Sequence, residues 1–394
     1  MTGRPLHALV LPPRQRLRQA LARALDGTGP AICPLSPTLP ALSLRTVLTD
    51  LRPTTVETPF GARTHSPGGT VDPGVAVVMA TSGSTGRPKL VELTADALLR
   101  SASTTLDRVG ARPQDRWLCC LPTDRIAGLQ VLTRSLLAGT DPVILPRFDT
   151  TAVAASDANL LAVVPTQLLR LLDAGVNVAR FRAVLVGGAA LPGRLRARAR
   201  THGARIVTTY GMTETCGGCV YDGEPPVDVR VRIGDDGLVQ LSGPVLFHRY
   251  HGDPELSAAA WRGDWFVTHD LGVMSGGRLH VLGRVDDIIN TGGHKVAAGH
   301  VADVLSGHPC VAEVVVVGRP DAEWGERVTA VVVPRRTPPT LTELRSWLRD
   351  RLPAYAAPRE LELRQALPRL ASGKPDRVSL RTSSARPPRK ERPS

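Results

Sequence analysis

The chain has 394 residues, of which 42% are apolar and 22% charged, so it is long enough for two or three domains with buried cores. No apolar run approaches the ~18 residues of a membrane-spanning helix, and residues 1–25 contain no signal-peptide apolar block. Six cysteines are too few for a disulfide scaffold in a chain of this length. These observations together predict a cytoplasmic protein without a membrane span. The net charge of +13 would suit nucleic acid, but no recognition helix, zinc finger or aromatic-basic surface accompanies it, so we expect no nucleic-acid partner.

The first informative segment is an apolar run of strand length at 75–80, followed by a polar loop and then by a helical pattern over 94–109. The loop reads Thr81, Ser82, Gly83, Ser84, Thr85, Gly86, Arg87, Pro88, Lys89. Glycines let backbone N–H groups approach a phosphate closely, hydroxyls add donors, and Lys89 supplies a positive charge. The spacing differs from the mononucleotide P-loop, which ends in Gly-Lys-Ser/Thr, and an ordinary polar turn is the alternative for this segment alone.

Residues 117–209 alternate between apolar strands and helical patterns. Strands are predicted at 117–122, 142–145, 160–164, 183–186 and 205–209, and helices at 126–138, 167–172 and 194–201. Strands that are apolar throughout predict an α/β fold with a mostly parallel sheet that helices cover on both faces. Ligands of such sheets bind beyond the carboxyl ends of the strands, where the polar loops 81–89, 187–189 and 210–215 are expected.

From residue 229 onward the predicted strands become shorter and resemble hairpins. The strands at 231–233 and 238–241, joined by an Asp-Gly turn, and those at 265–267 and 279–282 predict a small β-rich subdomain. Helices at 299–306 and 341–351 and strands at 313–318, 327–333 and 360–364 predict a compact α+β module. We therefore expect a large N-terminal domain at 1–285, a small mobile C-terminal domain at 286–382, and a disordered basic tail at 383–394.

Four further segments carry residues that suit a nucleotide. After the strand at 205–209, Tyr210 could stack on a base, Thr213 could donate to a phosphate, and Glu214 could hold Mg²⁺, which prefers oxygen ligands. A loop with a surface glutamate is the alternative for that segment. Asp270, in the segment 263–272, is a candidate acceptor for ribose hydroxyls. The other two segments are 283–295 and 367–377, and the latter places Lys374 in a short turn.

Each of these segments is a weak signal alone, but the five in this order resemble the adenylate-forming superfamily, over about residues 75–380. Members of that superfamily include acyl- and aryl-CoA ligases, adenylation domains of peptide synthetases, and luciferases. The resemblance implies that ATP, Mg²⁺ and coenzyme A take part in the reaction. It also implies a large N-terminal domain and a small C-terminal domain that rotates between two half-reactions.

The resemblance assigns roles to individual residues. The implied nucleotide-binding residues are Thr81, Ser82, Gly83, Ser84, Thr85 and Gly86 in the phosphate loop, Gly187, Gly188, Ala189, Tyr210 and Gly211 around the adenine, Asp270 and Arg284 at the ribose, and Lys295. The implied catalytic residues are Lys374, Lys89, Glu214 and Thr213, with Glu214 also the Mg²⁺ ligand. Asp286 is similar to the hinge residue, and Gly293 to the glycine that lines the tunnel for coenzyme A.

Two stretches, 121–135 and 216–223, resemble the o-succinylbenzoate–CoA ligases of menaquinone biosynthesis, as does the early position of the phosphate loop. This implies an ATP-dependent ligase that converts the acid into an acyl-adenylate, releases pyrophosphate, and transfers the acyl group to coenzyme A. Three alternatives stay open: another aryl- or acyl-CoA ligase, an enzyme that loads a carrier protein, and a non-catalytic nucleotide-binding homologue. The oligomeric state is also open, with a homodimer as one possibility.

The second carboxylate of o-succinylbenzoate needs a cation in the acid pocket, and Arg125 and Arg134 are the candidates. Solvated arginines on a helix surface are the alternative, and Arg125 stands where the family tends to show a histidine or an aromatic residue. The other predicted contacts with the acid are Gly128, Gln130 and Cys216. The Cys216-x-x-Cys219 spacing also permits a zinc or redox site, but no second pair accompanies it, so a wall of small residues is the favoured interpretation.

Overall fold

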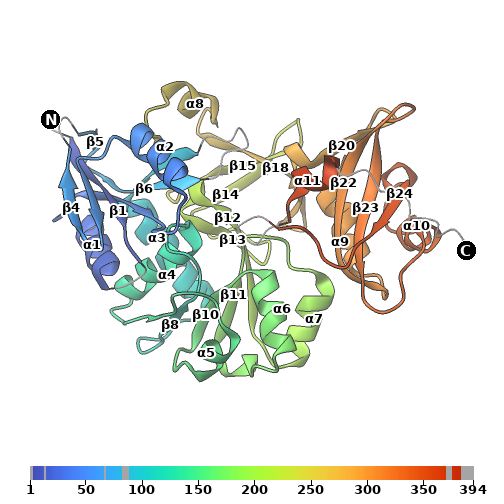
Figure 1. Ribbon diagram of the computed structural model, residues 1–394, viewed down its shortest axis with the longest axis horizontal. Helices are drawn as coiled ribbons and strands as arrows, with labels where there is room; N and C mark the ends of the chain where they lie inside the picture. The colour runs from blue at the N-terminus through green and yellow to red at the C-terminus, as the bar shows by residue number, and fades with distance from the viewer. Residues whose placement is uncertain (1–2, 13–14, 66–67, 82–87, 370–374, 383–394) are drawn as a thin grey trace, which may run out of the picture.

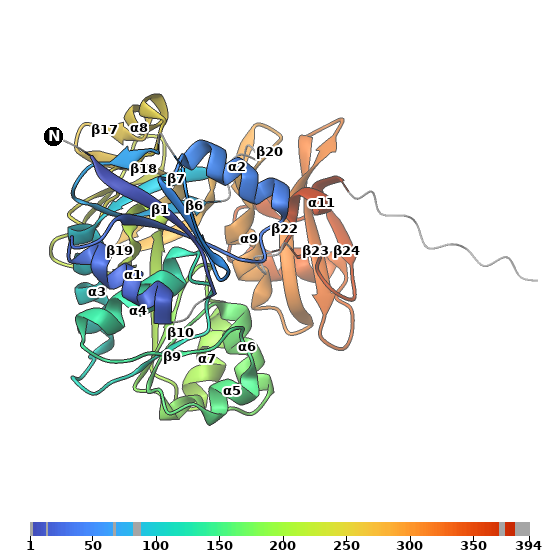
Figure 2. The same ribbon diagram turned by 60° about the vertical axis from the view of Figure 1, so that its left-hand side comes forward.

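The computed structural model describes residues 3–12, 15–65, 68–81, 88–369 and 375–382. These residues form three sheets in a large part and a fourth sheet in a smaller C-terminal part, which lies beside the large part in both views (Figures 1 and 2). The mixture of helix-covered and antiparallel sheets confirms the predicted α/β class. None of the described helices is both long and apolar enough to cross a membrane.

The first sheet has the strand order β16-β7-β6-β2-β1-β3-β4, with β5 paired to β1. Its strands are β1 (Arg4–Val10), β2 (Ala31–Leu35), β3 (Thr55–Thr58), β4 (Gly61–Thr64), β5 (Thr70–Val71), β6 (Val75–Thr81), β7 (Lys89–Thr94) and β16 (Arg249–Tyr250). Helix α1 (Gln15–Leu25) packs on one face through Leu17 and Leu21, and α2 (Ala41–Leu51) covers the other face through Val47 and Leu51. The spacing of four between Leu17 and Leu21 puts both side chains on one side of α1.

The second sheet has the order β13-β12-β11-β10-β8-β9 and is parallel except for β13. Its strands are β8 (Trp117–Cys119), β9 (Val143–Ile144), β10 (Leu160–Val163), β11 (Ala183–Val186), β12 (Ile206–Met212) and β13 (Gly217–Tyr221). Helices α3 (Ala95–Val109) and α4 (Ile126–Leu137) share one core with α1 and lie between the two sheets (Figure 1). Helices α5 (Thr150–Ala155), α6 (Pro165–Asp173) and α7 (Gly193–Thr201) cover the other face, as predicted for apolar parallel strands.

The third sheet is the predicted β-rich subdomain and is antiparallel. It contains β14 (Arg230–Ile233), β15 (Leu238–Ser242), β17 (Trp261–Arg262), β18 (Trp265–Ser275) and β19 (Arg278–Arg284), with α8 (Pro254–Ala259) before β17. Strand β18 is much longer than the predicted strand at 265–267. Asp270, which lies beyond the end of that predicted strand, is therefore inside a paired strand opposite Arg284.

The C-terminal part contains β20 (Ile288–Thr291), β21 (His294–Ala297), α9 (Ala298–Ser306), β22 (Val311–Asp321), β23 (Gly325–Pro334), α10 (Leu341–Arg349), β24 (Glu360–Leu363) and α11 (Arg377–Thr382). Its sheet has the order β21-β20-β23-β22, with β24 parallel to β23, and it has its own apolar core. The predicted boundary at Asp286 lies in a short 3₁₀ turn, Val285–Asp287, between the last strand of the third sheet and the first strand of the fourth. The predicted tail 383–394 lies outside the described residues.

Candidate active site

The two ends of the predicted phosphate loop are adjacent in the first sheet. Thr81 ends β6 and pairs with Lys89 at the start of the antiparallel strand β7, and the Thr81 hydroxyl donates to the Lys89 carbonyl at 3.2 Å. Residues 82–87, which include Ser82, Gly83, Ser84, Thr85 and Gly86, are not among the described residues. The pairing places Lys89 directly beside the end of β6.

Lys89 and Glu214 contact the same side chain, Tyr250. The Lys89 ammonium lies 5.2 Å from the centre of the Tyr250 ring, and the Tyr250 hydroxyl donates to Glu214 Oε1 at 3.0 Å. Glu214 belongs to a 3₁₀ turn, Thr213–Thr215, that follows β12 directly, and the Thr215 hydroxyl accepts a hydrogen bond from the Met212 N–H to fix this turn. Two residues predicted from distant segments are thereby brought together.

Glu214 has one carboxylate oxygen that could hold a divalent cation. Tyr250 occupies Oε1, and no hydrogen bond to Oε2 is present among the described residues. The described part of the chain also contains no group of three or more His, Cys, Asp or Glu side chains that could hold a metal ion. One free carboxylate oxygen suits Mg²⁺, which is commonly held by one or two carboxylates together with phosphate oxygens.

Tyr210 connects this group to the predicted ribose-binding pair. The Tyr210 hydroxyl donates to Asp270 Oδ2 at 2.8 Å, and the Arg284 guanidinium lies 3.5 Å from Asp270 Oδ1 across the β18–β19 pair. Burial and the neighbouring negative charge of Asp270 raise the pKa of Tyr210 well above its usual value, so its hydroxyl stays a donor. Because Tyr210 and Glu214 are four residues apart, the segment 210–215 joins both groups.

The predicted adenine segment follows β11. Gly188 has φ +77°, a left-handed conformation that favours glycine, and a Cβ on Gly187 would lie 2.8 Å from the Thr209 methyl carbon. Ala189 follows and is exposed. A Cβ on Gly211 would lie 1.9 Å from the Gly217 carbonyl oxygen, so the close approach of β12 and β13 requires glycine there. Gly187 and Gly188 thus keep the carboxyl end of β11 free of side chains.

Gln130, Cys216 and Gly128 form a tightly packed wall where α4 meets β13. Gln130 Nε2 donates to the Cys216 carbonyl at 2.7 Å and to the Leu98 carbonyl at 3.2 Å, and a Cβ on Gly128 would lie 2.2 Å from the Pro122 carbonyl oxygen. Burial raises the pKa of the Cys219 thiol to about 12 and raises that of Cys216 as well. Both side chains are buried, and no third His, Cys, Asp or Glu joins them in a metal-binding group within the described residues, which favours the wall interpretation.

The two candidate arginines occupy different environments. Arg134 is only 2% exposed, its guanidinium carbon lies 4.0 Å from the centre of the Trp117 ring, and its Nε donates to the Gln130 carbonyl at 2.8 Å. The alternative of a solvated surface arginine is therefore wrong for Arg134. Trp117 begins β8, so Arg134 lies toward the amino ends of the parallel strands, whereas ligands bind beyond the carboxyl ends. This placement favours a packing role, and the predicted contact with the acid stays a prediction.

Arg125 lies near the carboxyl end of β6. It is the residue before α4, its side chain is 48% exposed, and one guanidinium nitrogen donates to the Ala80 carbonyl at 3.4 Å. Ala80 directly precedes Thr81, so Arg125 is beside the start of the predicted phosphate loop. Of the two arginines, Arg125 is the one near the carboxyl ends of the strands.

Of the described residues predicted in the C-terminal part, Asp286 is linked to Asp270 through Arg284, whereas Gly293 and Lys295 lie apart from the Lys89, Glu214 and Asp270 groups. Gly293 (φ +78°) and the exposed Lys295 lie in the β20–β21 hairpin, and no hydrogen bond or ion pair connects them to those groups within the described residues. The Asp286 carboxylate lies 3.5 Å from Arg284, and its carbonyl accepts a 2.7 Å hydrogen bond from Arg381 in α11. Lys374 lies outside the described residues.

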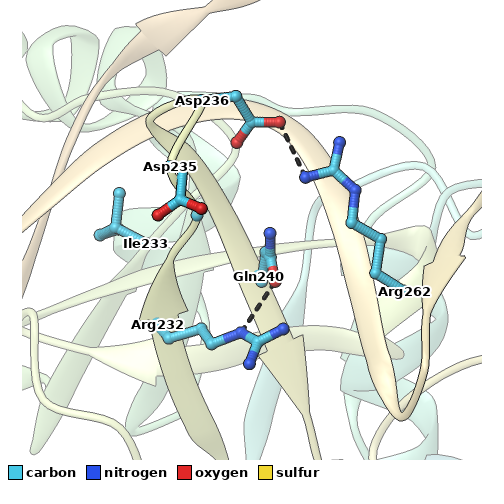
Figure 3. A pocket seen from close by; sticks show the side chains of 7 residues that line it. Arg232, Ile233, Asp235, Asp236, Gln240 and Arg262 are labelled. Atoms are coloured by element: carbon cyan, nitrogen blue, oxygen red, sulfur yellow. Dashed lines mark hydrogen bonds and ion pairs between the residues drawn. The ribbon is translucent and has the colours of Figure 1, made fainter.

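A cavity of about 400 Å³ lies elsewhere, on the third sheet (Figure 3). It is lined by Arg232, Ile233, Gly234, Asp235, Asp236, Gln240 and Arg262, none of which was predicted as a site residue. Arg232 Nε donates to Gln240 Oε1 at 2.8 Å, and Arg262 pairs with Asp236 at 2.9 Å, so these polar groups satisfy one another (Figure 3). Because none of the lining residues belongs to the candidate active site, we treat the cavity as separate from that site.

The sequence pattern of AMP-binding enzymes matches residues 62–238, and that of the AMP-binding enzyme C-terminal domain matches residues 300–374. This chain belongs to the AMP-binding enzyme family. This AMP-binding enzyme is 38% identical to the probable 2-succinylbenzoate–CoA ligase of Mycobacterium tuberculosis over 390 residues, which cover 95% of this chain and 94% of that relative. The resemblance stated from the sequence is thereby confirmed.

Two solved structures of o-succinylbenzoate CoA synthetase from Bacillus subtilis are similar to this AMP-binding enzyme. The complex with the acyl-adenylate intermediate has a TM-score of 0.82 and 28% identity, over 96% of this chain and 88% of that one. The complex with ATP and magnesium ion has a TM-score of 0.81 and 27% identity, over 95% and 89%. The order and packing of the four sheets thus belong to a known AMP-forming ligase fold.

Tyr250 is the site residue that the sequence analysis missed. It lies in a two-residue strand, too short for a periodic pattern, and no motif marks it. The sequence offers one weak signal, since the chain has only four tyrosines, and burial and polar contacts become visible only in the structure. Its partners, Lys89 and Glu214, are 161 and 36 residues away in the sequence, and only the folded chain brings them together.

Proposed function

We propose that this enzyme is an ATP-dependent o-succinylbenzoate–CoA ligase. It would join the acid to AMP with release of pyrophosphate and then transfer the acyl group to the thiol of coenzyme A. The observation that carries the proposal is the convergence of Lys89 and Glu214 on Tyr250, with Asp270 and Arg284 attached through Tyr210. The similarity to a probable ligase for the same acid over nearly the whole chain supports it.

The first half-reaction needs cations and donors rather than a general base. The attacking carboxylate is already ionised near pH 7, because carboxylic acids titrate at about 4. The cost lies in bringing two anions together and in building charge on phosphorus, which fixed cations offset. Lys89 holds a positive charge at the end of the phosphate loop, and we assign Lys374 to the same step.

Glu214 would hold Mg²⁺ through Oε2, while Tyr250 keeps Oε1 in place. When bound, Mg²⁺ would neutralise part of the phosphate charge.

The Asp270 carboxylate would accept hydrogen bonds from ribose hydroxyls, and Arg284 and Tyr210 fix its orientation. Thr213, half-buried beside Glu214, would donate to a phosphate. The glycines at 187, 188 and 211, with Ala189 and the Tyr210 ring, would border the adenine.

The acid specificity depends on the second carboxylate of o-succinylbenzoate. We assign Arg125 to this carboxylate in preference to Arg134, because Arg125 is half-exposed and near the phosphate loop. Gln130, Gly128 and Cys216 would form the rigid wall of the acid pocket. A rigid wall favours one acid shape, since the packed side chains cannot move aside without loss of contacts.

The second half-reaction would follow a rotation of the C-terminal part about Asp286. Lys374 would then leave the site, and the hairpin with Gly293 and Lys295 would approach it, with Gly293 beside the arm of coenzyme A. A free thiol titrates near 8.5, so thioester formation needs only modest assistance.

We also propose a cytoplasmic location for the enzyme, and a homodimer is the assembly to test by light scattering.

Isotope exchange between pyrophosphate and ATP, run with a panel of acids with and without coenzyme A, tests the proposal. We expect exchange with o-succinylbenzoate and formation of its CoA thioester. Exchange with a fatty, aryl or amino acid but not with o-succinylbenzoate would replace the substrate assignment. Adenylate formation without thioester would point to a carrier protein as acceptor. ATP binding without exchange for any acid would indicate a non-catalytic homologue.

A further inference from the structure

Tyr250 lies between the two side chains to which the phosphate chemistry is assigned. In the antiparallel β7–β16 pair, Tyr250 is opposite Val91, and residues opposite each other share a face of the sheet. Lys89 is two residues from Val91 and lies on the same face. This register, and not an accident of side-chain rotation, places the Tyr250 ring 5.2 Å from the Lys89 ammonium, within the range of a cation–π contact.

The hydroxyl of Tyr250 has one role in this arrangement. The side chain is buried, and its Oη donates to Glu214 Oε1 at 3.0 Å. A phenol hydroxyl has one hydrogen to donate, and here that hydrogen is directed at the Glu214 carboxylate. The bond holds Oε1 of Glu214, and no hydrogen bond to Oε2 is present within the described residues.

The opposite face of the same strand pair anchors Tyr250. Its neighbours Arg249 and His251 both reach the Glu92 carboxylate, at 2.9 Å from Arg249 Nε and 2.7 Å from His251 Nδ1. Glu92 is only 1% exposed, so this is a buried ionic cluster on the face away from Lys89. The Tyr250 N–H also donates to the Ser257 hydroxyl at 3.0 Å. The backbone of Tyr250 is therefore held from several directions.

We propose that Tyr250 is a positioning residue that orients Glu214 for Mg²⁺ and Lys89 for the phosphates. The proposal rests on the roles assigned to those two residues under the proposed function. The hydroxyl acts through Glu214 and the ring acts through Lys89, so the two contributions are separable. Loss of the hydroxyl should weaken the Mg²⁺-dependent part of ATP binding alone, and loss of the ring should weaken ATP binding with or without the metal.

Calorimetric titration of ATP into the full-length protein, with Mg²⁺ and with EDTA, tests this separation. We expect Tyr250→Phe to lower ATP affinity about tenfold with Mg²⁺ and to leave it unchanged in EDTA, because the hydrogen bond that orients the Glu214 carboxylate is lost. Tyr250→Leu should lower affinity in both. Tyr221→Phe removes another buried hydroxyl, which donates to the Gly218 carbonyl, and should leave both affinities unchanged.

A double substitution tests whether the hydroxyl acts through Glu214. Adding Tyr250→Phe to Glu214→Gln should cause no further loss of Mg²⁺-dependent affinity, since the partner is already neutral. Equal losses for Tyr250→Phe with Mg²⁺ and with EDTA, or wild-type affinity in both, would overturn the proposal. A full additive loss in the double variant would do the same. These binding readouts are independent of pyrophosphate exchange, so they separate a failure of this inference from a failure of the proposed ligase activity.

Discussion

The Tyr210 hydroxyl donates a 2.8 Å hydrogen bond to the Asp270 carboxylate, and this bond joins the second sheet to the third. Tyr210 lies near the end of β12 and Asp270 in the middle of β18, so the bond fixes where the β-rich subdomain lies relative to the parallel sheet. Asp270 also faces Arg284, the last residue of β19, immediately before the 3₁₀ turn that contains Asp286. The proposed ribose site is thus built at the junction of the two parts of the molecule.

Replacing Asp270 should affect ATP selectively. Asp270→Asn keeps the size of the side chain but removes the charge that pairs with Arg284 and accepts ribose hydroxyls. We expect the KM for ATP in pyrophosphate exchange to rise about tenfold, equivalent to about 1.4 kcal/mol, with the KM for the acid unchanged. Asp236→Asn, which removes a carboxylate paired with Arg262 on the same sheet, should change neither constant. A parallel rise in both KM values for Asp270→Asn would indicate a structural role instead.

The assignment of Arg125 predicts a substrate-dependent defect. Arg125→Ala should raise the KM for o-succinylbenzoate about tenfold or more, because a charge-assisted contact with the ring carboxylate is lost. For 4-oxo-4-phenylbutanoate, which lacks that carboxylate, the same substitution should have little effect. The measurement is the KM of each acid for wild type and variant. If both acids were affected equally, the arginine would be supporting the loop that follows Ala80 rather than the acid.

Arg134 should contribute to stability rather than to acid binding. Arg134→Ala removes the contact with Trp117 and leaves a cavity, so we expect a loss of about 2–4 kcal/mol in the free energy of unfolding, with the KM for the acid unchanged. Burial lowers the pKa of Arg134 to about 10, which shows that this site opposes charge. Arg134→Met, of similar length and no charge, should therefore be closer to wild type in urea denaturation. A raised KM for the acid with normal stability would restore the contact expected from the sequence.

Lys374 should be needed for only one half-reaction. Lys374→Ala is expected to abolish adenylate formation, while conversion of a supplied acyl-adenylate to the CoA thioester continues at close to the wild-type rate. The physical reason is that the lysine offsets charge on the phosphate during the first step and is absent from the site after rotation. Single-turnover assays of each half separate the two effects. Loss of both halves to the same degree would contradict this role.

The buried cysteines should make the free energy of unfolding depend on pH. Burial raises the thiol pKa to about 12 at Cys33, Cys119, Cys120 and Cys219. In the unfolded chain the same thiols titrate near 8.5, so above that pH the unfolded state releases protons that the folded state retains. The stabilising contribution is therefore complete below about pH 8.5 and is lost progressively as the pH rises toward 12. Urea denaturation at pH 7.5 and pH 9.5 should show a lower unfolding free energy at the higher pH.

The same burial controls thiol reactivity. With an excess of a thiol-specific reagent at pH 8, the native protein should react readily at Cys310, the cysteine with partial exposure, and the other five should react only after unfolding. Cys310→Ser provides the matched control and should abolish the native reaction. Rapid native labelling of Cys216 or Cys219 would instead revive the redox interpretation of that pair.

Much of the fold and of the candidate site could be predicted from local sequence. Apolar strands between helices predicted the second sheet, because side chains buried on both faces leave no polar alternation. The loops after β6, β11 and β12 were predicted from glycine, hydroxyl and acidic residues next to strand ends, where parallel strands direct their ligand-binding loops. The family followed from the order of these segments, since each motif alone is short and common.

Tertiary structure decided the rest, because the deciding contacts join residues that are distant along the chain. No local pattern distinguishes Arg125 from Arg134: the first lies beside Ala80, and the second is buried on Trp117, only because α4 packs between two sheets. Asp270 lies within a strand because β18 pairs with β15 and, from Asp270 onward, with β19. Tyr250 became a neighbour of Lys89 and Glu214 through the pairing of a two-residue strand with β7. Local sequence thus determined the elements and their loops, and long-range pairing and burial determined which side chains meet.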